Sequence, residues 1–594
     1  MTGRWLRRTL GGALTLVALV LIVLWLGLRA SLPKLDGEVV VAGIDDVATI
    51  ARDADGIPVI TASNRYDLAY ATGYAHGQDR FFQMDLIRRK AAGELSELVG
   101  AAAINADRRY RFHRFRARAA AVFEAAAEAD RRLMQSYAAG VNAGLDSLGA
   151  KPFEYFVLGS EPRAWTALDS LLAVYAMYMD LNDSRATKEI RRGMAHSVLP
   201  PEVYSWMYPQ GTSWDAPIMG APLEVPPIPS ADVYSIRDVP DDAPLAKEQG
   251  RYPLRGSNNW AVSGALTANG RALVANDMHL GHRVPNIWYQ ARLRVLGPDG
   301  RDVTGVTLPG SPFVISGINT QVAWGYTNSY GDWTDAVVLR PGATEGTYQT
   351  PEGDREFVAY VETINVKGGD PVKYEIRETI WGPVIDDVDY PAGEVVVSWI
   401  AHKPEGINLN LLKLERARSV AEALDIANTM SMPPQNFVTG DAGGNIGWTI
   451  AGQIPRKSGF DPMLPADWSV EHGWQGWLAP SEYPRVVNPD SGRIWTANAR
   501  VVDAATLRIV GDGGYDLGAR SGQIRDGLLA MDSFTPDDML AIQYDDRALF
   551  LSRWRDLLLD VLDANAVSAN PALAEYRDLA EGWIPRAVPD SVGY

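Results

Sequence analysis

The stretch RGSNNWAVSG, residues 255–264, determines how this chain is interpreted, because it places a serine directly after a glycine. If the bond between Gly256 and Ser257 is cut, Ser257 carries both a hydroxyl and a free α-amine. An α-amine titrates at about 7.7–8.0, so near neutral pH part of it is unprotonated and accepts the hydroxyl proton. One residue would then be nucleophile and base. Taken alone, a Gly-Ser-Asn run fits an ordinary turn equally well.

The chain differs in character on the two sides of this junction. Residues 37–64 favour a pair of strands, and residues 67–149 and 165–192 have the apolar spacing of amphipathic helices. Residues 200–253 are rich in proline, aspartate and alanine, which indicates a spacer. Glycine-punctuated β segments follow, with one helix expected at 419–429 and further helices after Pro536. We therefore divide the chain into 1–36, a mainly helical region 37–199, a spacer 200–256 and a nucleophile domain 257–594.

The composition excludes several classes of protein. The chain has 594 residues, of which 46% are hydrophobic, enough for a large core. Its net charge of -17 argues against nucleic acid as a partner, since phosphate binding needs clustered basic residues. The absence of cysteine excludes disulfides and thiolate nucleophiles. Because the HExxH, Walker and GxSxG patterns are also missing, serine is a leading candidate nucleophile.

The N-terminal segment is interpreted as an export element. Three arginines precede an apolar run from Leu10 to Leu28. At about 1.5 Å per residue this run just spans a hydrocarbon core of roughly 30 Å, which favours an uncleaved signal anchor over a cleaved signal peptide. The charge pattern places the N-terminus in the cytoplasm, so we expect an inner-membrane protein whose body lies in the periplasm.

Six blocks of sequence carry a resemblance to a known family. In order, they are RDADGIPVITA (52–62), GYAHGQDRFFQMDLIRR (73–89), RGSNNWAVSG (255–264), ANDMHLG (275–281), AWGYTNSYGDWTD (323–335) and NIGWTIAGQIPRKSGFDPMLP (445–465). Together they resemble the penicillin acylase family, the amidohydrolases with an N-terminal nucleophile that mature by self-cleavage. The resemblance implies an α+β fold, the αββα sandwich of N-terminal-nucleophile hydrolases, with a helical first chain and a β-rich second chain that form a heterodimer after cleavage.

The resemblance also assigns catalytic roles by position. It makes Ser257 the nucleophile after cleavage at Gly256, with the backbone NH of Asn328 and the side chain of Asn498 as oxyanion donors. It places His279 beside the nucleophile, to orient the serine amine or water, and Arg520 in support of Asn498. Each has an alternative: Asn498 as a turn cap, Arg520 as a structural ion pair and His279 as a core histidine.

One structural calcium ion is implied in the same way. Its expected ligands are Glu189, Asp332, Thr334, Asp335 and Pro462, a mixture of carboxylate and carbonyl oxygens that suits calcium. The alternative is two carboxylates on a solvated loop. A further family aspartate finds no aligned match, since Asp503 and Asp512 are both out of register.

The substrate is expected to be a small N-acyl amide. Where phenylacetyl-preferring members have apolar and aromatic residues, this chain has Ser316 and Gln435, which predicts a wider or more polar acyl pocket with Leu280 as one apolar wall. A fatty acyl chain, as in acyl-homoserine lactones, and a β-lactam side chain both remain open. Two other functions compete with hydrolysis: a noncatalytic envelope-associated binding protein, and sugar binding through some of the 18 tryptophans. The sequence ends in what resembles the middle of the family's second chain, so we expect a truncated second chain.

Overall fold

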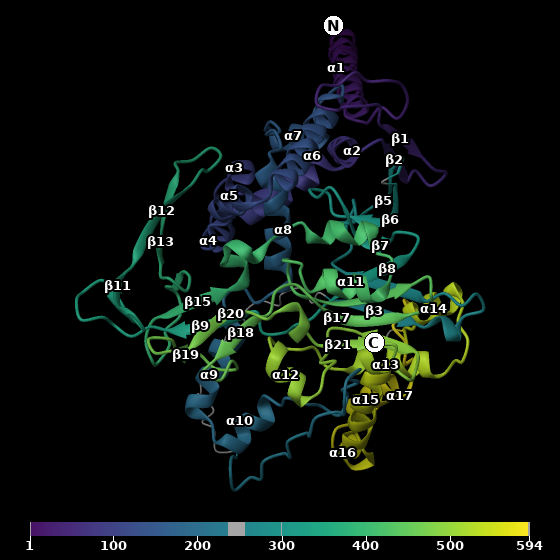
Figure 1. The fold of residues 1–594 in the computed structure, drawn as a ribbon. Coiled ribbons are helices and arrows are strands. Elements are labelled where there is room, and N and C mark those ends of the chain that lie inside the picture. Colours follow the sequence, from purple (N-terminus) through teal and green to yellow (C-terminus); the bar gives the residue numbers. More distant parts are fainter. Residues whose placement is uncertain (1, 236–255, 299, 592–594) are drawn as a thin grey trace.

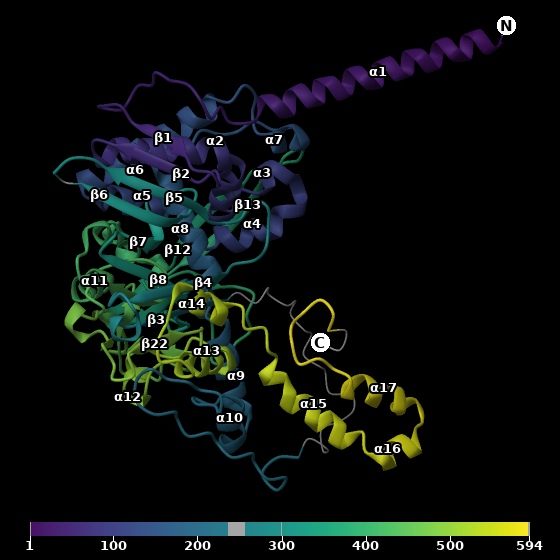
Figure 2. The same cartoon turned by 90° about the vertical axis from the view of Figure 1, so that its right-hand side faces the viewer.

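The computed structural model describes residues 2–235, 256–298 and 300–591. Helix α1 (Thr2–Ala30) extends away from the body, as Figure 2 shows. Its segment Arg8–Ala30 has a mean hydropathy of 2.5 and buries none of its most apolar window against the protein. Among the described residues it is the one helix long and apolar enough to cross a membrane, and its position suits a signal sequence equally well.

Two sheets packed face to face form the centre of the body (Figure 1). The larger sheet has nine strands, in the order β1 (Thr49–Arg52), β2 (Pro58–Ala62), β5 (Tyr289–Val295), β6 (Arg301–Thr307), β7 (Val314–Ile318), β8 (Val322–Asn328), β16 (Gln435–Asp441), β17 (Ile446–Ala451) and β21 (Arg485–Val487). The smaller sheet has the order β22 (Arg493–Thr496), β3 (Gly256–Val262) and β4 (Leu273–His279). Strands β3 and β4 pack on β8 and β16, so every residue of β16 and β17 is buried.

Helices cover the outer faces of both sheets. On the larger sheet, α2 (Arg65–Ala92) packs on β2 and β5, and α11 (Val420–Ala427) packs on β16 and β17. On the smaller sheet, α13 (Ala519–Leu529) contacts β22 and α14 (Pro536–Gln543) contacts β4. The order of layers is therefore helix, sheet, sheet, helix, which is the αββα sandwich expected from the sequence.

The long helix α2 is fixed at both ends and pressed against α6 (Glu128–Asp146). The side chain of Asn64 accepts hydrogen bonds at the start of α2, and Gly93 ends it in a left-handed conformation with φ 66°. Gly73 on α2 and Gly140 on α6 lie against the backbone of the opposite helix, where a Cβ atom would collide with a carbonyl oxygen. Glycine at these positions lets the two helices approach closely, and α8 (Ala167–Leu181) packs against both.

Further elements surround the sandwich. Residues before the spacer form α3 (Ser96–Val99), α4 (Ile104–Arg111), α5 (Phe115–Ala125), α7 (Phe153–Leu158), α9 (Thr187–Val198) and α10 (Pro201–Met207). Strands β14 (Val384–Ile385), β15 (Val395–Trp399), β9 (Thr334–Val338) and β19 (Ala466–Asp467) make a third sheet, and two-stranded pairs join β10 (Thr347–Thr350) to β11 (Gly353–Glu356), β12 (Val358–Ile364) to β13 (Val372–Glu378) and β18 (Pro455–Ser458) to β20 (Gly473–Trp477). After α12 (Ala504–Val510), the last helices, α15 (Leu549–Val561), α16 (Ala564–Ala569) and α17 (Ala572–Glu581), extend from the body in Figure 2.

Two expectations about the order of elements are confirmed and one is wrong. The strand pair within 37–64 is β1 with β2, and the helix expected at 419–429 is α11. Helices return at Ala504, not after Pro536, because Asp503 caps α12 and the glycines around α13 conceal its helical pattern in the sequence. The two halves also share one sheet, since β2 pairs in parallel with β5.

Part of the expected spacer is packed against the body. Ile218 and Met219 donate backbone hydrogen bonds of 2.9 and 3.2 Å to the carbonyl of Val501. Asp215 is buried in an ion pair with Arg500, 2.7 Å long. Residues 236–255 of the expected spacer lie outside the described residues, so its boundaries stay a prediction.

Candidate active site

Ser257 is the second residue of β3, the central strand of the smaller sheet. It lies opposite Met278 on β4, and Gly256 lies opposite His279. The Ser257 residue is only 6% exposed, because β3 is covered by the larger sheet. Gly256 and Ser257 belong to the same continuous strand, so the nitrogen of Ser257 is a peptide nitrogen here.

Two donors from different parts of the chain reach the Ser257 hydroxyl. The backbone NH of Asn328, the last residue of β8, donates to Oγ at 3.1 Å. The side-chain Nδ2 of Asn498 lies 3.3 Å from the same oxygen. The structure thus brings together Ser257, Asn328 and Asn498, the residues expected from the sequence to be the nucleophile and the oxyanion donors. Fixed donors that converge on one point stabilise negative charge that develops there.

The side chain of Asn498 is held at both ends of its amide. Its Oδ1 accepts the NH of Ser257 at 2.7 Å, and its Nδ2 also donates to the carbonyl of Asn328 at 3.0 Å. Asn498 itself has a left-handed backbone with φ 63°, a conformation that asparagine adopts more readily than most residues. Asn498 therefore has a specific role at Ser257 beyond the turn that contains it.

Arg520 fixes the orientation of this amide. From α13, its Nη2 donates to Oδ1 of Asn498 at 2.8 Å and pairs with Asp516 at 2.8 Å. Its Nη1 donates to Oδ1 of Asn258 at 2.7 Å and lies 3.3 Å from the carbonyl of Ser257. Since a guanidinium only donates, it fixes the Asn498 oxygen toward itself and the nitrogen toward Ser257.

His279 lies beside the Gly256 end of the junction. A Cβ atom on Gly256 would lie 3.4 Å from Nδ1 of His279 and 3.2 Å from both Arg520 and Asn498. The side chain of His279 is 42% exposed, and its Nε2 lies 2.7 Å from Oδ2 of Asp277. This is not a core histidine. No hydrogen bond joins it to Ser257 within the described part of the chain.

Asp277 is a site residue that the sequence analysis missed. Burial raises its pKa, but its interactions with His279, Asn258 and Gln543 together outweigh burial, so the pKa lies below its usual range. Its carboxylate is therefore ionised and fixes one imidazole nitrogen. The signal for it was present, since Asp277 stands two residues before His279 in the quoted block ANDMHLG.

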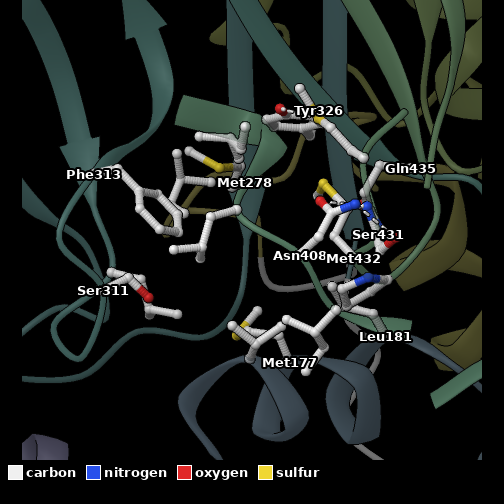
Figure 3. Close-up of a pocket in the computed structure, with 18 of the residues that line it drawn as sticks. Met177, Leu181, Met278, Ser311, Phe313, Tyr326, Asn408, Ser431, Met432 and Gln435 are labelled. Atoms are coloured by element: carbon white, nitrogen blue, oxygen red, sulfur yellow. Dashed lines mark hydrogen bonds between the residues drawn. The ribbon is translucent and has the colours of Figure 1, made fainter. Parts of the chain in front are cut away.

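An apolar cavity opens beside Ser257 (Figure 3). It encloses about 930 Å³, including its open mouth. Figure 3 shows Met177 and Leu181 along the lower wall, with Phe313 at the left of the view and Gln435 at the right. Met177 and Leu181 belong to α8, so both halves of the chain build the cavity. The side chain of Asn328 also donates to the carbonyl of Leu181 at 2.7 Å, which joins the halves at the site itself.

Two of the three residues that were expected in the acyl pocket line this cavity. Leu280 and Gln435 line the cavity, and Gln435 donates to Oδ1 of Asn328 at 3.2 Å. Ser316 was wrongly placed there: its hydroxyl donates to Asn276 and to the carbonyl of Trp324, and the described lining includes the neighbouring Ile315. Alternate residues of a strand face opposite sides, which accounts for the one-residue error. The pocket is consequently more apolar than expected.

The residues expected to bind calcium lie away from the cavity. Glu189 is on α9, Asp332 lies two residues before the start of β9, and Thr334 and Asp335 are on β9. Burial, followed by the neighbouring carboxylates, raises the pKa of Glu189 well above its usual value, and burial raises the pKa of Asp332 to about 7. The Nζ of Lys457 lies 2.6 Å from Asp332 and 2.8 Å from Asp335. Pro462 follows in the loop after β18.

The carboxylates that were out of register have other partners. Asp503 accepts from the backbone of Thr506 as the cap of α12. Asp512 pairs with Arg192 at 3.0 Å. Within residues 2–235, 256–298 and 300–591, no three acidic or histidine side chains are arranged to hold a metal ion.

The layers and the buried serine site define an N-terminal-nucleophile hydrolase fold. The sequence profile of the penicillin amidase family matches residues 47–594, and the chain belongs to this family of amidohydrolases that act on linear amides. It is 31% identical to penicillin acylase 2 proenzyme of Pseudomonas sp. (strain SE83), over 94% of this chain and 71% of that protein. It is 26% identical to acyl-homoserine lactone acylase QuiP of Pseudomonas fluorescens (strain Pf0-1), over 80% of this chain and 58% of that protein.

A solved structure also resembles the chain. Thermostable penicillin G acylase from Alcaligenes faecalis matches 55% of this chain and 59% of its own, at 21% identity and a TM-score of 0.46.

Proposed function

We propose that this chain is a self-processing amidohydrolase that cleaves N-acyl amides with Ser257 as its N-terminal nucleophile. The observation that carries the proposal is the position of the Ser257 hydroxyl, between the NH of Asn328 and the amide of Asn498, at the edge of an apolar cavity. A hydroxyl, two converging donors and an acyl-sized pocket are the parts that acyl transfer needs. One relative is named a proenzyme, penicillin acylase 2 proenzyme, and this supports maturation by cleavage.

Maturation begins when Oγ of Ser257 attacks the carbonyl carbon of Gly256. The hydroxyl proton moves to the departing nitrogen of Ser257, the Gly256–Ser257 amide breaks, and an ester forms between the same two residues. Water then hydrolyses the ester, which leaves a carboxylate on Gly256 and a free α-amine on Ser257. The His279–Asp277 pair, next to Gly256, is suited to accept and return the proton.

The mature site then uses the new amine as its base. The amine takes the proton of Oγ while Oγ attacks the substrate carbonyl carbon. The negative charge on the substrate oxygen is stabilised by the NH of Asn328 and Nδ2 of Asn498. The proton passes to the leaving amine, and water hydrolyses the remaining ester to release the acid.

The cavity determines the class of acyl group. Its walls are methionine, leucine, isoleucine and aromatic side chains, so the acyl group is apolar. Burial of each CH₂ contributes about 0.8 kcal/mol, which favours groups that fill the space. The acyl-homoserine lactones and penicillins in the names of the relatives both remain substrates to test.

We further propose that the body acts outside the cytoplasm. Helix α1 would anchor the chain in the inner membrane, with the body in the periplasm. After cleavage the two chains stay together as a heterodimer, because β2 pairs with β5 and α8 supports Asn328 across the junction.

N-terminal sequencing combined with a panel of chromogenic acyl amides tests the proposal. The purified chain should yield a second fragment that begins Ser-Asn-Asn-Trp and should hydrolyse apolar acyl amides. Ser257→Ala should stay a single chain without activity, whereas Ser197→Ala, an exposed serine on α9, should behave as the parent does. A single uncleaved parent chain with no amidase activity would instead support the noncatalytic binding protein.

A further inference from the structure

We infer that Lys457 supplies the resident positive charge for the carboxylate cluster of Glu189, Asp332 and Asp335, and that the protein holds this cluster together without calcium. The inference concerns a region apart from the Ser257 cavity and does not depend on the proposed function.

The lysine lies within the cluster. Its Nζ is 2.6 Å from Oδ2 of Asp332 and 2.8 Å from Oδ2 of Asp335, and its side chain is only 14% exposed. The two aspartates are almost completely buried. A buried ammonium and buried carboxylates stabilise one another only when they are paired, since each alone carries a large desolvation cost. The pairing joins distant parts of the chain, since Lys457 is on β18 and Asp335 is on β9.

A residue on a second strand, β20, also contacts the cluster. The indole Nε1 of Trp474, on β20, donates to Oδ2 of Asp335 at 2.6 Å. Strand β20 pairs with β18, the strand of Lys457. The same oxygen of Asp335 therefore accepts from the indole and forms an ion pair with the ammonium, so it is not a free ligand.

Glu189 completes the cluster from the first half of the chain. Its Oε2 accepts the backbone NH of Ala336 at 2.9 Å. Its Oε1 and Oδ1 of Asp335 are buried without hydrogen-bond partners in the described structure. These two atoms are attracted to a positive charge, and the charge that the structure places beside the cluster is the ammonium of Lys457.

The residues as arranged do not fit calcium. Calcium binds six to eight oxygens at 2.3–2.6 Å, and no such acidic group is arranged for a metal among the described side chains. A divalent ion in contact with Asp332 and Asp335 would also lie next to the ammonium that already contacts both. The nearby Asp512 is paired with Arg192, one turn along α9 from Glu189. Lys457 and Arg192 thus form ion pairs with carboxylates that would otherwise be available to bind the metal.

The cluster also has a structural consequence. It joins α9, which precedes the spacer, to β9 and β18, which follow Ser257. If the chain is cleaved at Ser257, this contact between the two parts consists of ion pairs and hydrogen bonds among the protein's own side chains, so it should not respond to chelators.

Metal content and thermal unfolding test the inference in the uncleaved Ser257→Ala chain, so that the result is independent of maturation. After dialysis against calcium-free buffer, elemental analysis should find far less than one calcium per chain. The unfolding midpoint should be the same in EDTA as in millimolar CaCl₂. One bound calcium per chain, or a midpoint that falls in EDTA, would overturn the inference.

Substitution of the lysine provides the second measurement. Lys457→Met keeps the length of the side chain but removes its charge, so its unfolding midpoint should fall by several degrees. Lys373→Met, at an exposed position on β13, is the matched control and should change the midpoint little. Failure of Lys457→Met alone to fold would agree with the inference, whereas a midpoint equal to that of the control would contradict it.

Discussion

The NH of Ser257 donates a 2.7 Å hydrogen bond to Oδ1 of Asn498, while Nδ2 of the same side chain lies 3.3 Å from the Ser257 hydroxyl. A single amide thus contacts both groups that the proposed mechanism uses, the nitrogen that becomes the base and the oxygen that attacks. After cleavage, Oδ1 would accept from the new amine and so direct its lone pair toward Oγ.

Removal of the Asn498 side chain should reduce kcat by about 10²–10³, because one oxyanion donor is lost. Asn498→Gly is the better variant, since glycine accepts the left-handed φ of 63° without strain and alanine does not. The measurement is kcat for an acyl amide on protein whose cleavage has been confirmed by sequencing.

Asn488→Gly is the matched control, since Asn488 also has a left-handed backbone, with φ 46°. Its side chain bonds Ile446 and Asn445 rather than Ser257, so the variant should leave kcat within about twofold. Equal kcat values for the two variants would show that Asn498 supplies no oxyanion donor.

Arg520 should set the pH at which the mature enzyme becomes active. Its guanidinium lies close to Ser257, and a nearby positive charge disfavours the protonated amine, which lowers the pKa of that amine. Arg520→Met should therefore raise the pKa and move the acidic limb of the kcat profile to higher pH. Arg520→Lys keeps a positive charge at this position, so its acidic limb should lie close to that of the parent. An unchanged acidic limb in Arg520→Met would mean that the charge acts only in folding.

Much of this site was predictable because its residues stand in contiguous sequence blocks. Ser257 and Asn328 stand in such blocks, Asn498 was assigned by position through the resemblance, and the fold brings the three within hydrogen-bond distance. The layers of the fold were implied by the resemblance to the penicillin acylase family, and the sequence pattern itself showed only that two unlike halves meet at the junction.

The rest could not be predicted, because it depends on which face of a strand a residue occupies and on partners distant in sequence. Ser316 missed the pocket by one residue, which places a side chain on the opposite face of its strand. The pairing of Lys457 with Asp332 joins positions that are far apart along the chain. Nothing local in the run of residues 455–458 indicates that its lysine is buried.

The width of the acyl cavity should determine chain-length preference. Met177→Phe replaces a flexible side chain on the wall formed by α8 with a larger, rigid ring. We expect kcat/KM for long linear acyl chains to fall about tenfold relative to short ones, a change that corresponds to about 1.4 kcal/mol. The control Met207→Phe alters an exposed methionine and should leave the ratio unchanged. A fall of equal size for all chain lengths would place the acyl group elsewhere.

Acid should weaken the contacts of Glu94 in the helical half. Burial raises the pKa of this carboxyl, but its bonds to Arg116 and Arg163 outweigh burial and lower it to about 2. Because the folded pKa lies below the usual 4.5, the stabilisation is fully present above pH 4.5 and is lost as the pH falls toward 2. The shift corresponds to about 3 kcal/mol, which we reduce to about 1–2 kcal/mol since both arginines are a third or more exposed.

Glu94→Gln should accordingly lower the unfolding midpoint at pH 7, and the difference from the parent should shrink between pH 4.5 and the acid limit of the folded state. Glu482→Gln is the control, because Glu482 pairs with Arg456 at the surface, where solvent screens the pair. We expect the control to change the midpoint little at any pH. A Glu94→Gln deficit that stays constant from pH 7 to pH 3 would show that the loss comes from packing rather than from the charge of the carboxylate.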